Sequence, residues 1–279
     1  MLAVVLSLGS SLVYGVSDFL GGLKSRSLPL LAVLLVSQGT ALAVLALSAP
    51  LLGESPPDGE HLAYAAIAGA AEAAAIAALY RGLAIGTMSI VAPVAACAPA
   101  FPVAASAVLG ELPGALQSAG IALAIAGVAM ISLGPPGREA SASTGVSVVY
   151  GLVTALGFGV FLTAMDAASE GGVHWALLIA RLVAVAIFVA VLLVTRQRPA
   201  LARRDVPVLA LIGVLVLAAD ALYAIASTEG LLSVVAVLSS LYPVVTIALA
   251  WLYLRERLRP VQQLGVAVTI CGAVAISLA

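Results

Sequence analysis

Long runs of apolar residues alternate with short polar breaks along the whole chain. A run of about 20 apolar residues matches the length of a helix that crosses a bilayer. Helices are the expected spanning element, because the runs are too long and too uniformly apolar for barrel strands. Ten runs qualify: Leu2–Leu23, Leu28–Leu52, Leu62–Gly82, Thr87–Gly110, Gly114–Leu133, Val146–Ala167, His174–Thr195, Val206–Ser227, Leu231–Leu254 and Pro260–Leu278.

The second half of the chain repeats the first. The stretch from Glu111 to Leu133 recurs from Glu256 to Leu278, and its polar and glycine positions coincide. Repeats of this kind indicate a duplicated structural unit. We therefore predict a five-helix repeat at 1–133, a loop at 134–145 and a second repeat at 146–279. The matched pairs are Glu111 with Glu256, Gln117 with Gln262, Gly120 with Gly265 and Gly127 with Gly272.

An odd number of spans in each repeat places the second copy upside down in the membrane. The predicted fold class is therefore an all-α membrane protein, with ten transmembrane helices forming two inverted five-helix repeats around a central cavity. Of the 12 Lys and Arg residues, all but Arg181 follow odd-numbered spans. Cytoplasmic loops carry an excess of such residues, so we expect those loops inside and both termini on the outer, periplasmic side.

Composition supports a multi-pass membrane protein. The chain is 63% hydrophobic and only 9% charged, whereas soluble proteins carry about 25% charged residues. A soluble fold could not cover so much apolar surface, so the lipid bilayer is an expected partner. The net charge of −1 gives no indication of a nucleic-acid partner.

Prolines interrupt matching spans of the two halves. Pro93, Pro99 and Pro102 lie in the fourth span, and Pro243 lies in the ninth. Proline inside a helix removes a backbone hydrogen bond and kinks it. Transporters built from inverted repeats bind substrate near the midplane, beside such interrupted helices. We therefore interpret these prolines as hinge or kink residues beside a cavity, while a static kink remains the alternative.

Polar residues inside the spans are candidates for the cavity wall. Glu72 lies midway along the third span, where a charge costs at least ~2.5 kcal/mol. It lines a cavity, is protonated or pairs with Arg181, and the sequence leaves these options open. Gln38 lies near the middle of the second span. Asp18 and Asp220 lie nearer the ends of their spans, and we interpret them as helix-end or structural residues.

Aromatic side chains are scarce, at 5% of the chain, so those within spans are informative. Together with a few hydroxyls they suit a pocket for a small molecule with an apolar side chain. Tyr242 beside Pro243 and Phe101 beside Pro102 are the most suggestive. The paired glycines of the fifth and tenth spans instead indicate a packing surface on one face of each helix, and we expect both helices to brace the bundle without touching substrate.

Catalytic constellations are missing from the sequence. His61 and His174 are the only histidines, and no Cys/His cluster has metal-ligand spacing. No GxxxxGK loop is present to hold a nucleotide phosphate. We therefore expect no enzyme activity, no metal site and no cofactor.

The ten spans in two repeats, with Gly110-Glu111 and Arg255-Glu256 followed by "Q..G......G", resemble the drug/metabolite transporter superfamily, and its EamA-type ten-helix branch most closely. Within that branch the chain looks like a bacterial exporter of amino acids, similar to the aromatic amino-acid exporter. The resemblance implies a monomeric inner-membrane permease whose cavity is lined by helices 1–4 and 6–9. The implied substrate-binding residues are Tyr14, Gln38, Glu72, Tyr80, Phe101, Phe158, Ser239, Ser240 and Tyr242.

One departure affects the expected mechanism. The four-helix multidrug relatives carry a membrane-embedded Glu in their first helix that handles protons and cations. The first and sixth spans here contain no Glu. We therefore predict an alternating-access exporter of small amino acids, aromatic and other neutral ones, and of related metabolites, without proton coupling. The alternative is a proton-coupled exporter of cationic drugs or polyamines that uses Glu72.

Overall fold

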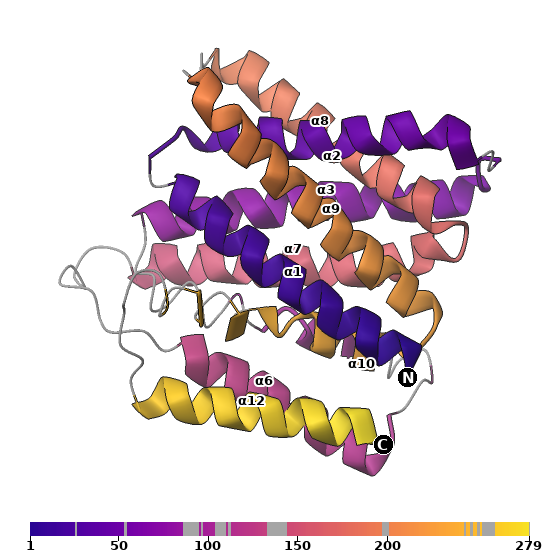
Figure 1. Cartoon of the computed structure of the whole chain (residues 1–279), viewed down its shortest axis with the longest axis vertical. Helices are drawn as coiled ribbons and strands as arrows, with labels where there is room; N and C mark the ends of the chain where they lie inside the picture. Colours follow the sequence, from indigo (N-terminus) through magenta and orange to yellow (C-terminus); the bar gives the residue numbers. More distant parts are fainter. Residues whose placement is uncertain are drawn as a thin grey trace.

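A computed structural model of the chain describes residues 1–25, 27–52, 55–85, 95, 97–103, 110, 113–132, 144–196, 201–242, 244–245, 248–249, 252 and 260–278. Helices make up the regular structure of these residues (Figure 1). They are α1 Leu2–Ser25, α2 Leu30–Leu52, α3 Gly59–Ile85, α6 Ala115–Ser132, α7 Thr144–Ser169, α8 Val173–Thr195, η1 Arg203–Asp205, α9 Val206–Thr228, α10 Leu232–Ser239 and α12 Pro260–Leu278.

Six of the described helices are long and apolar enough to cross a membrane, namely α1, α2, α3, α7, α8 and α9. Their bounds lie within a few residues of the predicted spans, and α12 matches its prediction at both ends. Helix ends follow local chemistry. Arg196 ends α8 with a left-handed φ of 50°, and a proline lies in the first turn of α9, where its missing N–H leaves no donor unpaired.

The predicted ninth span, Leu231–Leu254, is interrupted a few residues before Pro243, the proline beside which we predicted a kink. Helix α10 ends at Ser239. The amide of Ser240 bonds to the carbonyl oxygens of Ala236 and Val237, and the amide of Leu241 reaches back to Leu238 at 3.4 Å. This tightening from four-residue to three-residue spacing ends the α-helix in the middle of an apolar run.

The fourth predicted span is also interrupted where it is described. Residues 97–99 form a turn that precedes a short helical piece at 100–103. The amide of Ala100 bonds to the carbonyl of Cys97 at 3.0 Å, and that of Phe101 bonds to Ala98 at 3.2 Å. Most of Thr87–Gly110 lies outside the described residues. The matching spans of the two halves therefore both contain a break in their described parts.

Helices from the two halves pack against each other. Helix α1 lies along α9, α3 lies along α7 and α8, and α2 contacts both α8 and α9. Two polar contacts join α1 to α9 and to the short helix η1 that precedes it. The Ser10 hydroxyl donates to the Ala219 carbonyl at 2.8 Å, and Lys24 pairs with Asp205 at 2.9 Å. The two chain termini lie at the same end of the helices (Figure 1).

Small residues allow the closest helix crossings. A Cβ at Gly69 of α3 would collide with the backbone of Ala180 in α8, and one at Gly213 of α9 would collide with the Ser37 carbonyl of α2. Backbones that approach so closely gain dispersion contacts, which drive helix association in lipid. Both crossings join the first half to the second.

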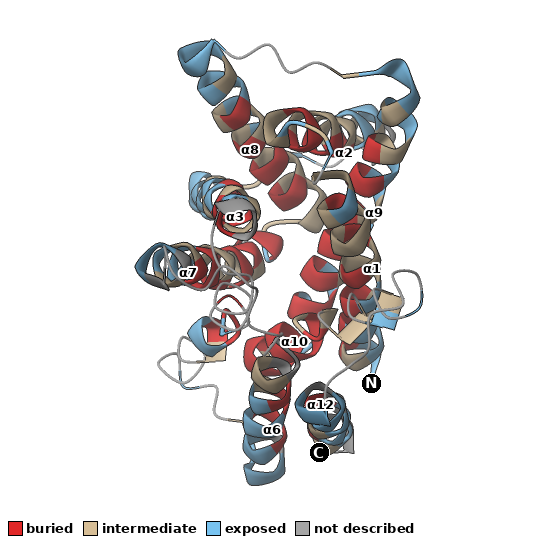
Figure 2. Ribbon diagram, turned by 90° about the vertical axis from the view of Figure 1, so that its left-hand side faces the viewer, coloured by how far each residue is buried: buried red, intermediate tan, exposed pale blue. Residues whose placement is uncertain are grey.

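Helices α6 and α12 form a separate pair beside the main bundle (Figure 1). A Cβ at Gly127 would press on Thr269 and the Gly265 carbonyl, and one at Gly272 would press on Ala124. The glycines predicted to form packing surfaces do so, and the two helices pack on each other through them. Buried residues gather where the remaining helices face one another, while the outer faces are exposed, as expected for contact with lipid (Figure 2).

Candidate functional site

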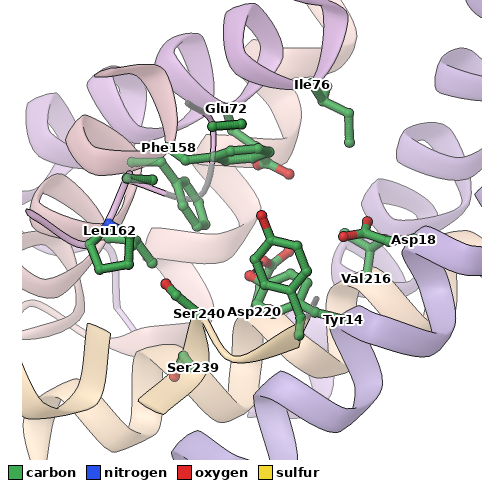
Figure 3. Close-up of a pocket in the computed structure, with 15 residues that line it drawn as sticks. Tyr14, Asp18, Glu72, Ile76, Phe158, Leu162, Val216, Asp220, Ser239 and Ser240 are labelled. Carbon is green, nitrogen blue, oxygen red and sulfur yellow. Dashed lines mark hydrogen bonds between the residues drawn. The ribbon is translucent and has the colours of Figure 1, made fainter. Parts of the chain in front are cut away.

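A cavity lies among helices of both halves (Figure 3). The cavity has a volume of about 60 Å³, which is room for a few waters or a slender solute. Its wall combines three carboxylates with aromatic, aliphatic and serine side chains. The lining residues are Tyr14, Asp18, Glu72, Ile76, Ala95, Ala98, Pro99, Phe158, Phe161, Leu162, Val216, Asp220, Ser239, Ser240 and Tyr242.

A buried polar cluster forms one side of this wall, and Arg181 of α8 is its centre. Its Nη1 atom donates to Oε1 of Glu72 at 2.7 Å and also to Oε1 of Gln38. Its Nη2 atom pairs with Oδ2 of Asp220. The four residues keep between 1% and 4% of their accessible surface. The cluster therefore ties α2, α3, α8 and α9 together inside the bundle.

Tyr14 connects α1 to the same cluster. Its hydroxyl donates to Oδ1 of Asp220. Its ring meets the ring of Tyr242 edge to face, with centroids 6.2 Å apart and an interplanar angle of 60°. Such aromatic pairs add about 0.5–1.5 kcal/mol beyond their buried area. Tyr14 thus contacts the charged cluster through its hydroxyl and the aromatic ring of Tyr242 through its own ring.

The cluster has more negative than positive groups. One guanidinium faces two carboxylates, so an ionised cluster carries one excess negative charge. Oε2 of Glu72 is buried and has no hydrogen-bond partner among the described residues. A buried acceptor without a partner costs about 1–3 kcal/mol, and more when it is charged. Because Glu72 also lines the cavity, a ligand donor in the cavity would relieve this cost.

Asp18 forms a second acidic position on the wall, from α1. It is half-buried, and within the described part of the chain its carboxylate has neither a hydrogen bond nor an ion pair. In Figure 3 its carboxylate lies apart from the side chain of Glu72. The cavity therefore has two acidic positions on different helices.

The rest of the wall is mostly apolar. Phe158 and Leu162 of α7 lie across the cavity from Tyr14 (Figure 3). Ser239 and Ser240 reach the wall because α10 ends there. The Ser239 hydroxyl is buried, with no hydrogen-bond partner among the described residues. Polar groups at the break of a helix beside an apolar wall suit a small amphipathic solute.

The structure brings six of the nine predicted substrate-binding residues to the cavity, namely Tyr14, Glu72, Phe158, Ser239, Ser240 and Tyr242. The other three are elsewhere. Gln38 belongs to the Arg181 cluster. The Tyr80 hydroxyl lies against Gly21 of α1, and Phe101 packs on Gly159 of α7 and is 40% exposed.

The predicted hinge prolines are only partly described. Pro99 lines the cavity, and its carbonyl accepts a bond from the Val103 amide at 3.2 Å. Pro102 lies in the short helical piece that follows. Pro93 and Pro243 lie outside the described residues.

Sequence reasoning missed Asp18 and Asp220 as wall residues and gave them structural or helix-end roles. Asp220 does have a structural partner in Arg181, yet both carboxylates line the cavity. Their signal was present, because a charged side chain inside a membrane span is a functional candidate wherever it lies. For Glu72 the sequence left open a place on the cavity wall, protonation or pairing with Arg181. The structure shows both the pairing with Arg181 and the place on the wall.

Comparisons with known proteins place this geometry in a wider context. The sequence matches the model of the EamA-like transporter family over residues 1–133 and 145–278. A search of curated protein sequences found no match. Among solved structures, one described as a crystal structure of a protein shares 16% sequence identity, with a TM-score of 0.79 over 99% of this chain and 96% of that chain. At this identity the likeness shows a shared fold alone.

Proposed function

We propose, from the premise that this chain belongs to the EamA-like transporter family, that it exports small metabolites carrying an amino group. The family and the membrane-spanning helices make it an integral membrane transporter of small molecules. Within that function, the proposed substrate class is neutral amino acids, aromatic ones included, and related metabolites such as amines, and their shared ammonium is the group that the cavity wall would bind. The proposed location is the bacterial inner membrane, and the proposed active form is a monomer similar to the aromatic amino-acid exporter.

The observation that carries the proposal is the composition of the cavity wall. Asp18 and Glu72 offer acceptors to an ammonium group, which has N–H donors and no acceptor. Phe158 and Phe161 offer an apolar surface to a side chain. A small solute with a charged amine and an apolar remainder would satisfy both parts of the wall.

Alternating access between two inverted five-helix repeats, at 1–133 and 146–279, is the proposed mechanism. In the two repeats, α1 corresponds to α7, α2 to α8 and α3 to α9. The contact between α1 and α9 therefore corresponds to the contact between α7 and α3, and the contact between α2 and α9 corresponds to the contact between α8 and α3. The breaks at 97–99 and after Ser239 also fall in corresponding spans. These correspondences support transport by rocking one repeat against the other.

The experiment that tests this proposal measures flux of labelled phenylalanine, threonine and methionine into liposomes containing the purified protein. We expect uptake above that of protein-free liposomes, with equal rates with and without a pH gradient. Competition by unlabelled amines should reduce the uptake, because they share the ammonium group. If none of the amino acids and no amine moves in any condition, the proposed export function is wrong.

The excess of carboxylates favours a second candidate, a proton-coupled exporter of cationic drugs or polyamines. Glu72, with its unpartnered Oε2 atom, would then exchange a proton for the cation. This candidate predicts flux that follows an imposed pH gradient and disappears in Glu72→Gln. Gradient-independent flux of a neutral amino acid that persists in Glu72→Gln would exclude it.

A further inference from the structure

The charged groups around the cavity form two separate acidic subsites. The first is Asp18 on α1. The second is the Arg181 cluster, in which one guanidinium contacts the carboxylates of Glu72 and Asp220. The two subsites reach the cavity from different helices, and the side chains of Asp18 and Glu72 lie apart in the close-up (Figure 3).

The described wall of the cavity has more negative than positive groups. With all three carboxylates ionised, Asp18 contributes one negative charge and the Arg181 cluster contributes one in excess. The described residues that line the cavity include no Lys, Arg or His. Uncompensated charge inside a membrane protein is costly and is normally paired. The cavity can therefore accept two positive charges, one at each acidic subsite.

Two buried oxygen atoms on the cavity wall can accept hydrogen bonds from the N–H groups of a ligand. Oε2 of Glu72 and the hydroxyl of Ser239 have no hydrogen-bond partner within the described part of the chain. These two residues retain 4% and 2% of their accessible surface, and both line the cavity. A primary ammonium has three N–H donors and suits carboxylate and hydroxyl acceptors together.

The geometry points to an organic dication with two separated ammonium groups, a linear diamine, as the ligand of this cavity. One ammonium would pair with Asp18, and the other would bind Glu72 at its free oxygen, with Ser239 as a further acceptor. The methylene chain between them would lie against the apolar part of the cavity wall, which includes the rings of Tyr14 and Phe158. This inference rests on the proposed transport function and identifies the substrate class of the same cavity.

Other charge patterns fit less well. A monoamine neutralises one subsite and leaves the other uncompensated. An amino acid brings a carboxylate, but Arg181 is not among the described residues that line the cavity, and its Nη1 and Nη2 atoms face Glu72, Gln38 and Asp220. The cavity volume of about 60 Å³ also favours a slender chain over a drug-sized cation.

The test compares three ligands with the same carbon chain: putrescine with two ammonium groups, butylamine with one, and γ-aminobutyrate with one ammonium and one carboxylate. Each competes with labelled putrescine for uptake by liposomes containing the full chain. We expect putrescine to compete roughly ten-fold more strongly than butylamine, since a charged hydrogen-bonded contact contributes about that factor. γ-Aminobutyrate should compete least.

Matched variants identify the subsites. Asp18→Asn and Glu72→Gln each remove one charge with little change in shape, so each should abolish the preference for putrescine over butylamine. Asp18→Glu should restore it in part. Asp58→Asn removes a carboxylate outside the helices and should retain the preference. Elution as a single species in detergent and an unchanged Tm show that each variant is folded.

The outcomes separate this inference from the proposed function. Equal competition by putrescine and butylamine in the wild-type protein overturns the dication. A preference that survives in both Asp18→Asn and Glu72→Gln overturns the two subsites. Flux of neutral amino acids without any effect of putrescine leaves the export function standing and overturns the inference alone. Absence of flux for every amine and amino acid overturns both.

Discussion

Arg181 of α8 and Glu72 of α3 form an ion pair 2.7 Å long, and their side chains keep only 1% and 5% of their accessible surface. The pair joins a helix of the first half to a helix of the second. Buried ion pairs contribute little net stability, because desolvation offsets their attraction. Losing one partner is costly, however, because it leaves an uncompensated charge.

Replacing Arg181 with Met should destabilise the protein by about 3–5 kcal/mol, because Glu72 and Asp220 would be left without their cation. Chemical unfolding in detergent measures the change. Arg204→Met, at an exposed position, is the matched control and should have little effect. Adding Glu72→Gln and Asp220→Asn to Arg181→Met should recover much of the loss. Equal stability of Arg181→Met and the control would contradict the assigned role.

Gly69→Ala should weaken the crossing of α3 and α8, because the new methyl group would meet the backbone of Ala180. Overpacking of this kind costs about 1–3 kcal/mol. Gly39→Ala, on α2, meets nothing within 4 Å and should be neutral or stabilising by up to ~1 kcal/mol. The two variants are compared by Tm in the same detergent. A Tm for Gly69→Ala equal to or above that of Gly39→Ala would exclude this close contact.

Tyr242→Ala should lower the rate of amine or amino-acid flux roughly ten-fold, because it removes an aromatic wall and the ring that supports Tyr14. The fold should survive, since the Arg181 cluster remains. Tyr64→Ala on α3 is the control, because Tyr64 is 37% exposed and lies away from the cavity. Liposome uptake measures both variants. Unchanged flux in Tyr242→Ala would remove this residue from the site.

The positive-inside rule predicts that the loops before and after α8 lie on opposite sides of the membrane, with the loop before α8 outside. In a background of Cys97→Ser and Cys271→Ser, Glu170→Cys should react with a membrane-impermeant maleimide added outside intact cells. Arg204→Cys should react only after the membrane is opened. Both positions are exposed in the fold. Labelling of Arg204→Cys in intact cells would reverse the proposed topology.

Asp58 precedes α3 outside the spanning segments, and its carboxylate accepts hydrogen bonds from the ring and the amide of His61. These bonds lower the pKa of Asp58 below its ordinary value. Because the folded-state pKa is lowered, the interaction stabilises the fold above the ordinary pKa and is lost as pH falls through the folded-state value. His61→Ala should return the pKa of Asp58 to its ordinary range.

Carboxyl-carbon NMR of aspartate-labelled protein in detergent measures this titration, and Asp58→Asn identifies the signal. An Asp58 signal that titrates at the same pH with and without His61 would show that the hydrogen bonds do not act on the carboxylate.

The helices were predictable because lipid leaves the backbone few choices. A run of about 20 apolar residues must satisfy its own N–H and C=O groups, so it becomes a helix that ends near polar or breaking residues. For this reason the bounds of α8, Val173–Thr195, and of α12 follow the apolar runs. The end of helix α10 does not follow from the length of the apolar run, because the chain turns after Ser239 within that run.

Part of the cavity was predictable on the same grounds. Glu72 and Tyr242 stood out as polar or aromatic residues in apolar spans, beside alanines or a proline. Tyr80 and Phe101 satisfied the same criterion and do not line the cavity. A helix that is apolar all round carries no pattern that shows which face turns inward.

The order of apolar runs and breaks was therefore enough to establish a helical membrane protein and the chemistry available inside it. The meeting of Arg181 with Gln38, Glu72 and Asp220 depended on tertiary packing. These residues are far apart in the chain, and small residues such as Gly69 set how closely and at what rotation their helices cross. Helix rotation and crossing follow from the shape of all contacting side chains together, a property that local sequence patterns do not contain.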